Sequence, residues 1–357
     1  MKINLNTKEL NQLLNPLQSV INDNHIVPIL QSVRIDISKK GIRVIGDNHE
    51  TNCENFLKLK TEIEESFCVN FTMLISIIKA LPNQEIQLTL KDNTLFIKHT
   101  KGEFKLPTFS SNEFSVAEKE DYDGKAIVNG KLLKSSLKVA NKFILNDDLQ
   151  PMANVCIEIG KKIIIRATNR ACLFEETLKG KGDAKTILLS GKASSSLLAL
   201  IEDADEIEML YNDNRVYFKF GLKKIMVVQQ QGQFPLEMFN NIIKTTKGAN
   251  EINVDTTDFN AALKRATTLS SKEKENKVKL NLGANSLEFL CDNTMSGTKG
   301  QEVIDSSFFE EKNIAFNYKM LQEIISVFDE KPTFLINEKN CFCITSKKKT
   351  GILAPMG

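Results

Sequence analysis

The sequence contains three copies of one strand-then-helix pattern, and this repeat constrains the fold more than any other feature. The copies read INLNTKELNQLL at residues 3–14, AIVNGKLLKSSL at 126–137 and INVDTTDFNAAL at 252–263. In each copy a short alternating stretch is followed by Asn or Asp and then by apolar residues at helical spacing. Asn and Asp accept hydrogen bonds from the free amides of a first helical turn, so each copy predicts a short strand and a capped helix.

A second strand-then-helix pattern lies later in each third of the chain. Its expected cap residues are Asn70, Ser190 and Asn317. The offsets between these caps are 120 and 127 residues, close to the offsets of 123 and 126 between the first three copies. Two patterns in the same order and at nearly the same period indicate three tandem copies of one domain.

Alternating apolar and polar residues follow the second helix of each third. They occupy residues 85–98, 206–220 and 333–345. Each stretch contains a polar turn with Asn or Asp, which predicts an antiparallel hairpin. We therefore predict an α+β fold of three domains, each with two helices packed on antiparallel strands. The predicted domains are 1–121, 122–246 and 247–357; three unrelated α+β domains are the alternative, and the matched offsets count against it.

Basic side chains are concentrated in the middle third, mainly on its first predicted helix. The whole chain has 47 Lys and Arg against 45 Asp and Glu, so contact with nucleic acid would require a local patch. The lysines of this helix are Lys131, Lys134, Lys138 and Lys142. Their spacing places them within roughly 80° of one another, and no acidic residue interrupts residues 125–145. Such a face suits sequence-independent contact with phosphate, and a solvated lysine face is the alternative.

No motif in the sequence indicates catalysis or a bound cofactor. The phosphate-binding, dinucleotide-binding and serine-nucleophile glycine motifs are absent, and the three histidines lack metal-ligand spacing. We interpret the acidic run 202–208 as a helix end and turn facing water. Cys341 and Cys343 alternate along a predicted strand, so we expect core residues there. The sequence therefore predicts no metal, no cofactor and no enzymatic activity.

The start of the chain and its cysteines bear on the cellular compartment. No apolar run approaches the ~18 residues of a membrane span. The first residues include Glu9 where a signal peptide needs an apolar core. The seven cysteines form no CxxC pair, which is typical of reduced, mostly buried thiols in a cytoplasmic protein.

Short strings along the whole chain carry a resemblance to a known family. They are VPIL at 27–30, GIRVIGDNHETNCE at 41–54, QPMANV at 150–155, ATNRACLF at 167–174, GQFP at 232–235 and LAPMG at 353–357. In this order they resemble the pattern of the bacterial sliding clamp family, the beta subunit of the replicative DNA polymerase. The last four correspond to the family's RPVLNG, ATDGHRLA, GRFP and VMPMR.

This resemblance implies a function that depends on ring closure. In the family, two subunits join head to tail into a ring of six similar domains, with helices lining the hole and sheets forming the outer wall. A ring around duplex DNA holds it by topology, so weak phosphate contacts suffice. The implied lining residues are Lys131, Lys134, Lys138, Lys142, Lys192, Lys264 and Arg265. Asn24 stands where the family has a basic residue before the first-domain proline.

The resemblance also implies a pocket between the second and third domains for short peptides of polymerases, the clamp loader and repair proteins. Its wall would consist of Met152, Ala153, Thr168, Leu173, Pro235, Ile352, Leu353, Pro355 and Met356. An apolar, methionine-containing wall suits recognition of small hydrophobic motifs. The family's Gly-His-Arg is replaced by Arg170, Ala171 and Cys172, and its last arginine by Gly357.

Contact between subunits would come from Phe104 and Leu106 of the first domain and from Thr268 and Leu269 of the third. The leading hypothesis is a homodimeric DNA sliding clamp that needs a separate ATP-driven loader. Two other hypotheses remain open at this point. One is a divergent paralogue that docks proteins without stably encircling DNA, and the other is a nucleic-acid-processing enzyme.

Overall fold

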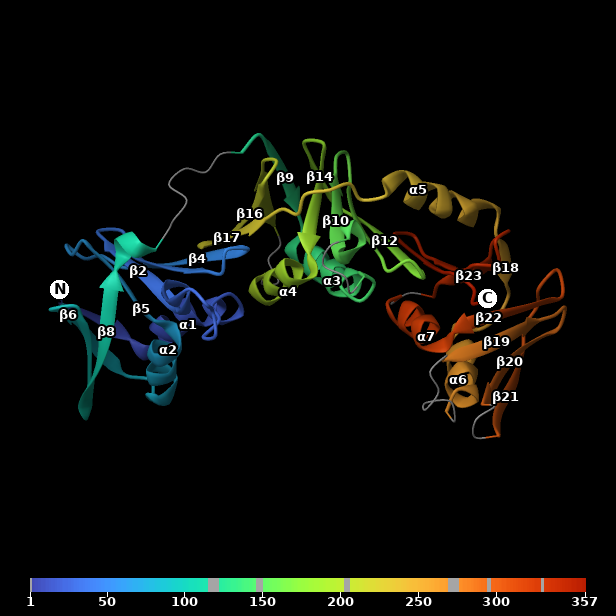
Figure 1. The fold of residues 1–357 in the computed structure, drawn as a ribbon, viewed down its shortest axis with the longest axis horizontal. Helices are drawn as coiled ribbons and strands as arrows, with labels where there is room; N and C mark the ends of the chain where they lie inside the picture. Colours follow the sequence, from blue (N-terminus) through green and yellow to red (C-terminus); the bar gives the residue numbers. More distant parts are fainter. Residues whose placement is uncertain are drawn as a thin grey trace. The chain divides into compact units, whose positions relative to one another are not determined.

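The computed structural model describes residues 2–114, 122–145, 150–201, 206–268, 276–293, 297–328 and 331–357. They form two compact units (Figure 1). The first unit comprises Met1–Lys134, Ile159–Lys161 and Lys179–Gln231, and the second comprises Ser135–Glu158, Lys162–Leu178 and Gly232–Gly357. None of the described helices is long and apolar enough to cross a membrane. Residues 202–205 of the acidic run lie outside the described residues.

One antiparallel sheet runs through the first unit in the order β1-β6-β7-β8-β5-β2-β3-β4-β17-β16-β15-β9-β13. Its strands in the first repeat are β1 (Lys2–Asn6), β2 (Ser32–Ser38), β3 (Gly41–Asp47), β4 (Thr51–Lys58), β5 (Glu65–Asn70), β6 (Glu85–Lys91), β7 (Thr94–His99) and β8 (Gly102–Ser110). Its strands in the second repeat are β9 (Gly124–Val128), β13 (Gly180–Gly182), β15 (Ile207–Tyr211), β16 (Arg215–Phe220) and β17 (Lys223–Val228). Because β4 pairs with β17, the sheet continues from the first repeat into the second.

The helices of the first unit pack on this sheet, and α4 also packs on the strand β14. They are α1 (Thr7–Leu14), α2 (Phe71–Ala80) and α4 (Gly191–Leu200), with the one-turn helices η1 (Asn15–Ser19), η2 (Pro28–Gln31) and η3 (Ser111–Glu113) and the strand β14 (Lys185–Ser190). The helices α1 and α2 pack against each other (Figure 1). A further helix, α3 (Gly130–Ala140), begins in the first unit and ends in the second.

The second unit contains two sheets. The strands of the larger sheet that belong to this unit follow the order β10-β11-β12-β25-β24-β23-β18, and those of the other sheet follow the order β21-β20-β19-β22. Their strands are β10 (Asn154–Ile159), β11 (Ile163–Thr168), β12 (Cys172–Leu178), β18 (Asn250–Ile252), β19 (Lys277–Leu282), β20 (Ser286–Asn293), β21 (Thr298–Asp305), β22 (Lys312–Asn317), β23 (Thr333–Ile336), β24 (Phe342–Thr345) and β25 (Lys349–Leu353). The helices are η4 (Pro151–Ala153), α5 (Leu236–Lys244), η5 (Thr245–Gly248), α6 (Thr256–Ala266) and α7 (Tyr318–Ser326). Because β12 pairs with β25, the larger sheet joins the second repeat to the third.

All six predicted cap residues precede a helix and accept a hydrogen bond from its first turn. The shortest oxygen-to-nitrogen distance at each cap ranges from 2.8 Å at Asn6 to 3.1 Å at Asn317. The other four caps are Asn70, Asn129, Ser190 and Asp255. The three predicted hairpins are also present, as β6–β7, β15–β16 and β23–β24. The predicted α+β repeat is therefore confirmed at the level of its local elements.

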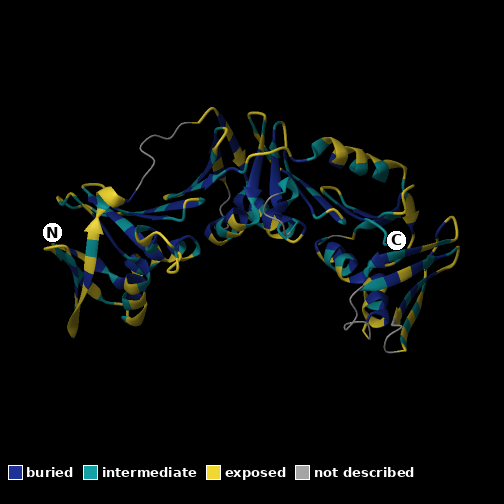
Figure 2. Ribbon diagram, in the orientation of Figure 1, coloured by how far each residue is buried: buried dark blue, intermediate teal, exposed yellow. Residues whose placement is uncertain are grey.

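Apolar side chains between helices and sheets form the cores of both units. Figure 2 shows that buried residues are concentrated in the strands and on one side of the helices. In the second unit, Phe259 of α6 packs against Phe289, Phe334 and Phe342, with ring centroids 4.8–5.6 Å apart. Each such ring contributes about 1.5–3 kcal/mol through burial of its apolar surface. The alternating strand patterns place these rings on the inner faces of the sheets.

The cysteines are free thiols, and all of them except Cys341 are buried, as the sequence predicted. Cys343 lies within β24, whereas Cys341 lies just before that strand and is half-buried. The interpretation of Cys341 as a second core residue on the strand is therefore wrong. Cys341 is the last residue of the turn between β23 and β24, and its amide donates to the side chain of Asn337.

We expect Cys341 to be the first thiol that iodoacetamide modifies in the folded protein at pH 8. Burial raises the pKa of the Cys53 and Cys156 thiols to about 12, so almost no reactive thiolate is present there. Burial also raises the pKa of Cys341, but its side chain is accessible. Peptide mapping by mass spectrometry against time checks the order. Labelling of Cys53 as fast as Cys341 without denaturant would contradict it.

Candidate functional site

The helix α3 separates basic and apolar side chains onto different faces. Leu133 and Leu137 are fully buried, whereas Lys131 and Lys138 are exposed. Lys134 is half-buried on the same side as these two lysines. The helical spacing in the sequence therefore produced the predicted separation over Gly130–Ala140.

Lys142 does not belong to that helical face, which corrects the prediction. α3 ends at Ala140, and the amides of Lys142 and Phe143 bond three residues back to Val139 and Ala140. This tighter turn buries Phe143, whose ring stacks on Phe174 at 5.9 Å. The Lys142 ammonium lies 3.8 Å from the carboxylate of Glu323 in α7. The acid missing from the local sequence thus comes from the third repeat.

The other predicted basic residues lie on two other helices, α4 and α6. Lys192 in the first turn of α4 and Lys264 in the last turn of α6 are exposed. Arg265 donates to Glu302 of β21 at 2.8 Å. That ion pair raises the pKa of Arg265 through the hydrogen bond from its guanidinium, and it offsets part of the positive charge on this helix.

The predicted peptide pocket is partly assembled by strand pairing in the second unit. β12 and β25 place Leu173 opposite Ile352 and Cys172 opposite Leu353. The amide of Ala354 donates to the carbonyl of Ala171 at 2.8 Å. The C-terminal segment therefore runs directly beside the turn that the resemblance singled out.

The remaining predicted pocket residues differ in exposure. Ala153, Thr168, Leu173, Ile352 and Leu353 are buried, whereas Met152, Pro235, Pro355 and Met356 are half-buried. The amide of Met356 donates to the Ala315 carbonyl at 2.8 Å, which fixes the end of the chain on β22. Within the described part of the chain, no hydrogen bond links η4 or Pro235 to β25. The buried residues of this predicted wall are thus covered by other atoms, whereas the half-buried ones expose part of their side chains.

Arg170 occupies a constrained place beside this wall. Its φ is 76°, in the left-handed region that side chains other than glycine rarely adopt. The Thr168 hydroxyl donates to the Cys172 carbonyl at 2.8 Å and the Cys172 amide to Asn169, and together they close the turn. The exposed Arg170 guanidinium donates to the side-chain oxygen of Gln150. This residue therefore adds positive charge at the rim.

The predicted subunit contacts of the first domain lie on β8. Phe104 is 37% exposed and stacks on His99 at 5.4 Å. Leu106 is only 6% exposed and pairs with Leu95, so its side chain belongs to the core of its own domain rather than to the surface. β8 pairs with β7 along Gly102–Pro107, but with β5 only from Thr108 onward. The first half of β8 thus pairs with one neighbour among the described strands.

The predicted contacts of the third domain lie at the end of α6. Thr268 is exposed, and its hydroxyl donates to the Lys264 carbonyl at 2.8 Å. Leu269 lies outside the described residues. Beside α6, β21 is the first strand in the order of its four-stranded sheet, and its Val303 is 58% exposed. An edge strand with an exposed valine is a template for pairing with another strand.

Comparison with known proteins identifies the family. The model of the DNA polymerase III beta subunit N-terminal domain matches residues 1–118. The model of the C-terminal domain of the same subunit matches residues 245–345. The chain belongs to the DNA polymerase III beta subunit family. Members of this family are non-catalytic accessory factors rather than enzymes.

Individual relatives are distant in sequence and close in fold. The Beta sliding clamp of Staphylococcus epidermidis is 24% identical over 339 residues, covering 90% of this chain and 88% of that protein. The crystal structure of the DNA polymerase sliding clamp from Pseudomonas aeruginosa has a TM-score of 0.91 at 17% identity, with full coverage of both chains. The Helicobacter pylori beta clamp bound to a DNA ligase peptide has a TM-score of 0.87 at 18% identity, also with full coverage. The chain therefore has the fold of three tandem DNA-clamp domains.

One structurally important residue of this family member, Arg166, did not enter the sequence argument. It lies on β11 and is only 4% exposed. Its guanidinium pairs with Glu175 at 2.8 Å and with Glu158, and donates to Asn240 of α5 at 3.2 Å. The guanidinium carbon also lies 5.5 Å from the ring centroid of Phe239. A single cation within the apolar run IIIRA was the signal that could have identified it.

Proposed function

We propose that this protein is a sliding clamp, in which two copies close head to tail around duplex DNA and tether a DNA polymerase to it. The match of the beta-subunit domain models at both ends of the chain carries this proposal. The likeness to solved clamps over the whole chain supports it. The ring works in the cytoplasm and needs a separate loader that hydrolyses ATP. Its repeats correspond to residues 1–121, 122–246 and 247–357.

The basic helix faces supply the DNA contact in this proposal. Lys131, Lys134 and Lys138 face away from buried leucines on α3, and Lys192 and Lys264 occupy exposed positions on other helices. Ammonium groups on flexible stems contact phosphate without reading bases, which permits sliding. Lys142 and Arg265 contribute less, because each has a carboxylate within 4.0 Å.

Strand pairing between two copies would close the ring. The first half of β8 and the strand β21 each leave a side available within the described structure. Pairing of β8 in one copy with β21 in the other would satisfy backbone groups on both strands and cover Phe104 and Val303. Two such contacts related by two-fold symmetry give a closed dimer.

The wall formed by β12, β25 and the C-terminal segment is the peptide-docking site in this proposal. The Helicobacter pylori relative was crystallised with a DNA ligase peptide. Met152 and Met356 present half-buried, flexible thioethers, which suit peptides with small apolar side chains. Arg170 and Gly357 alter the charge of this rim from the usual family pattern.

Retention on circular DNA tests the encirclement. Labelled protein is loaded onto a nicked plasmid with its loader and ATP, and then separated from free protein at about 0.5 M salt, where phosphate contacts are screened. We expect the protein to remain on the circle and to leave after a restriction enzyme cuts the plasmid. Equal loss before and after cutting would contradict encirclement and favour an adaptor that only docks proteins. Chelator-sensitive degradation of DNA by the chain alone would favour an enzyme.

Truncating the side chain of Met356 and deleting Gly357 is expected to weaken peptide binding. Replacement of Met356 by Ala, combined with deletion of Gly357, removes apolar surface worth about 1–2 kcal/mol, which corresponds to a Kd roughly tenfold higher. Fluorescence titration with a labelled peptide from the polymerase of the same cell measures it. Met73→Ala, on exposed surface of α2, is the control. Unaltered affinity would remove this pocket from the proposal.

A further inference from the structure

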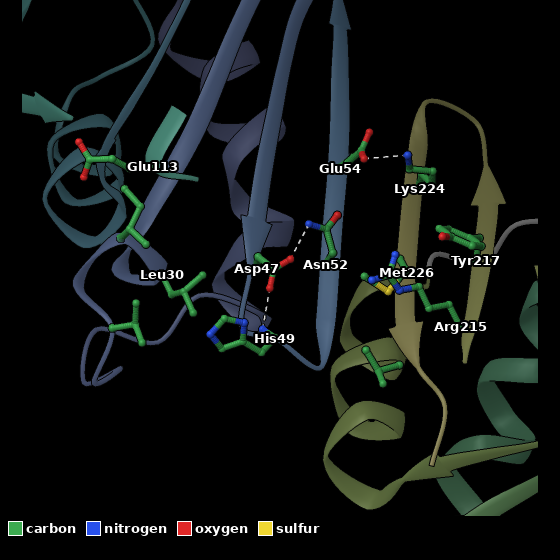
Figure 3. A pocket seen from close by; sticks show the side chains of 13 residues that line it. Leu30, Asp47, His49, Asn52, Glu54, Glu113, Arg215, Tyr217, Lys224 and Met226 are labelled. Carbon is green, nitrogen blue, oxygen red and sulfur yellow. Dashed lines mark hydrogen bonds and ion pairs between the residues drawn. The ribbon is translucent and has the colours of Figure 1, made fainter. Parts of the chain in front are cut away.

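A separate cavity of about 360 Å³ lies in the first unit, where the first repeat meets the second (Figure 3). Its residues come from η2 and the segment before it, from β3, β4 and the turn between them, from η3, and from β16 and β17. Leu30 and Met226 contribute apolar surface, whereas Asn52 and Arg215 contribute polar groups. The cavity is not part of the peptide pocket proposed above, which lies in the second unit.

The repeat places this cavity at the position that corresponds to the peptide pocket. His49 in the turn between β3 and β4 has a φ of 72°, and Arg170 in the turn between β11 and β12 has a φ of 76°. Three residues after His49, Asn52 pairs with Met226, and three residues after Arg170, Leu173 pairs with Ile352. The one-turn helices η2 and η4 both begin with proline. Two successive repeat junctions are therefore built from corresponding elements.

Charge distinguishes the two ends of this cavity. Arg215 has no ion-pair partner among the residues that the structure describes, although it lies on the cavity wall. The neighbouring Lys224 is paired with Glu54 at 2.7 Å. The carboxylate of Asp47 already accepts from the His49 amide at 2.6 Å and from Asn52 at 2.8 Å. In Figure 3, Glu113 lies at the end opposite Arg215.

The cavity continues along β16 and β17 past Arg215. A second recess of about 570 Å³ shares Arg215, Tyr217 and Val228 with the first. Its other residues are Asn212, Asn214, Gln229 and Gln231. A chain lying over Arg215 would thus meet apolar side chains on one side and amide groups on the other. Amides can bond to the backbone of an extended peptide, and the free guanidinium selects a carboxylate.

We propose that this cavity is a second peptide-docking site, which takes an extended segment of a partner protein with an apolar side chain followed by an acidic one. The apolar side chain lies against Leu30 and Met226, and the carboxylate pairs with Arg215. If the peptide bound in the reverse direction, its carboxylate would lie near Glu113 and be repelled, so this direction is disfavoured. The site lies within one subunit, so it does not depend on encirclement of DNA.

Methyl signals from ¹³C-labelled methionine locate binding at each pocket separately. Met226→Leu and Met356→Leu assign the two signals. The ligands are the acetylated, amidated peptide Ala-Leu-Ala-Glu-Ala and its counterpart with Lys in place of Glu. We expect the Met226 signal to shift to a plateau as the Glu peptide is added. The same shift should require an about tenfold higher concentration of the Lys peptide. The response of Met226 should persist in the Met356→Leu protein.

A charge-matched pair of variants tests the role of the guanidinium. Arg215→Gln should raise the Kd for the Glu peptide about tenfold. Lys181→Gln, which removes an exposed lysine of β13, should leave this Kd unchanged. A Met226 signal unmoved at millimolar peptide, or equal responses to both peptides, would overturn the proposal. So would an equal shift with acetate alone, which would show simple anion binding. A shift with protein concentration in the absence of peptide would assign the cavity to a second copy of this chain.

Discussion

Replacement of both Lys134 and Lys138 by glutamate is expected to lower the amount of protein retained on nicked circular DNA by at least about tenfold. Each subunit loses two positive and gains two negative charges on the exposed face of α3. A dimeric ring thus changes by about eight charges, and contacts that released counterions from phosphate become repulsive. The dimer should persist, because neither lysine lies on β8 or β21.

Loading assays on the nicked plasmid and sedimentation of the free protein check both parts of this expectation. Lys161→Glu with Lys162→Glu makes the same change of charge in the exposed turn between β10 and β11, away from the helices. This control should load normally. Equal retention of the α3 variant and the control would remove α3 from the DNA-facing surface.

Replacement of Arg166 by methionine is expected to lower the free energy of unfolding by about 3–5 kcal/mol. The substitution leaves the carboxylates of Glu158 and Glu175 without their cation, and the side chain of Glu175 is only 17% exposed. Burial by itself would lower the pKa of Arg166. The hydrogen bond and charge of Glu175, together with the charge of Glu158, outweigh burial and raise the pKa. The ion pairs therefore keep this arginine charged in the core.

The same substitution should also loosen α5. The guanidinium joins β11 to that helix through Asn240 and the ring of Phe239. Urea unfolding measures the loss of stability, and hydrogen exchange of the α5 amides measures the loosening. Lys161→Met, at an exposed position next to β11, is the control. Unchanged stability of the Arg166 variant would show that the buried ion pairs contribute little.

Local features were predictable because their causes are local. Asn129 caps α3 through a hydrogen bond to the Leu132 amide three residues away, so the pattern of cap and apolar spacing was sufficient. The turn residues Asp92 and Asn93 both have positive φ in the hairpin β6–β7, as Asn and Asp commonly do. The threefold recurrence of these signals predicted three tandem copies of one α+β domain.

Predictions that required a distant partner failed. The sequence around Lys142 contains no acid, yet the fold brings Glu323 to its ammonium. The resemblance implied Leu106 as a subunit contact, but its side chain is only 6% exposed and lies in the core of its own domain. In both cases the partner is far away in sequence, and spacing along one segment carries no information about it.

The sequence by itself determined the capped helices, the hairpins and their threefold repetition, because hydrogen bonding within a turn and apolar periodicity act over a few residues; the family came from the resemblance of short strings along the chain. Only the tertiary structure decided which charges are neutralised, which edges of β8 and β21 stay open, and where recesses form. Those properties depend on pairings such as β4 with β17 and β12 with β25, which join segments more than one hundred residues apart. Contacts of that range arise only when the whole unit has folded.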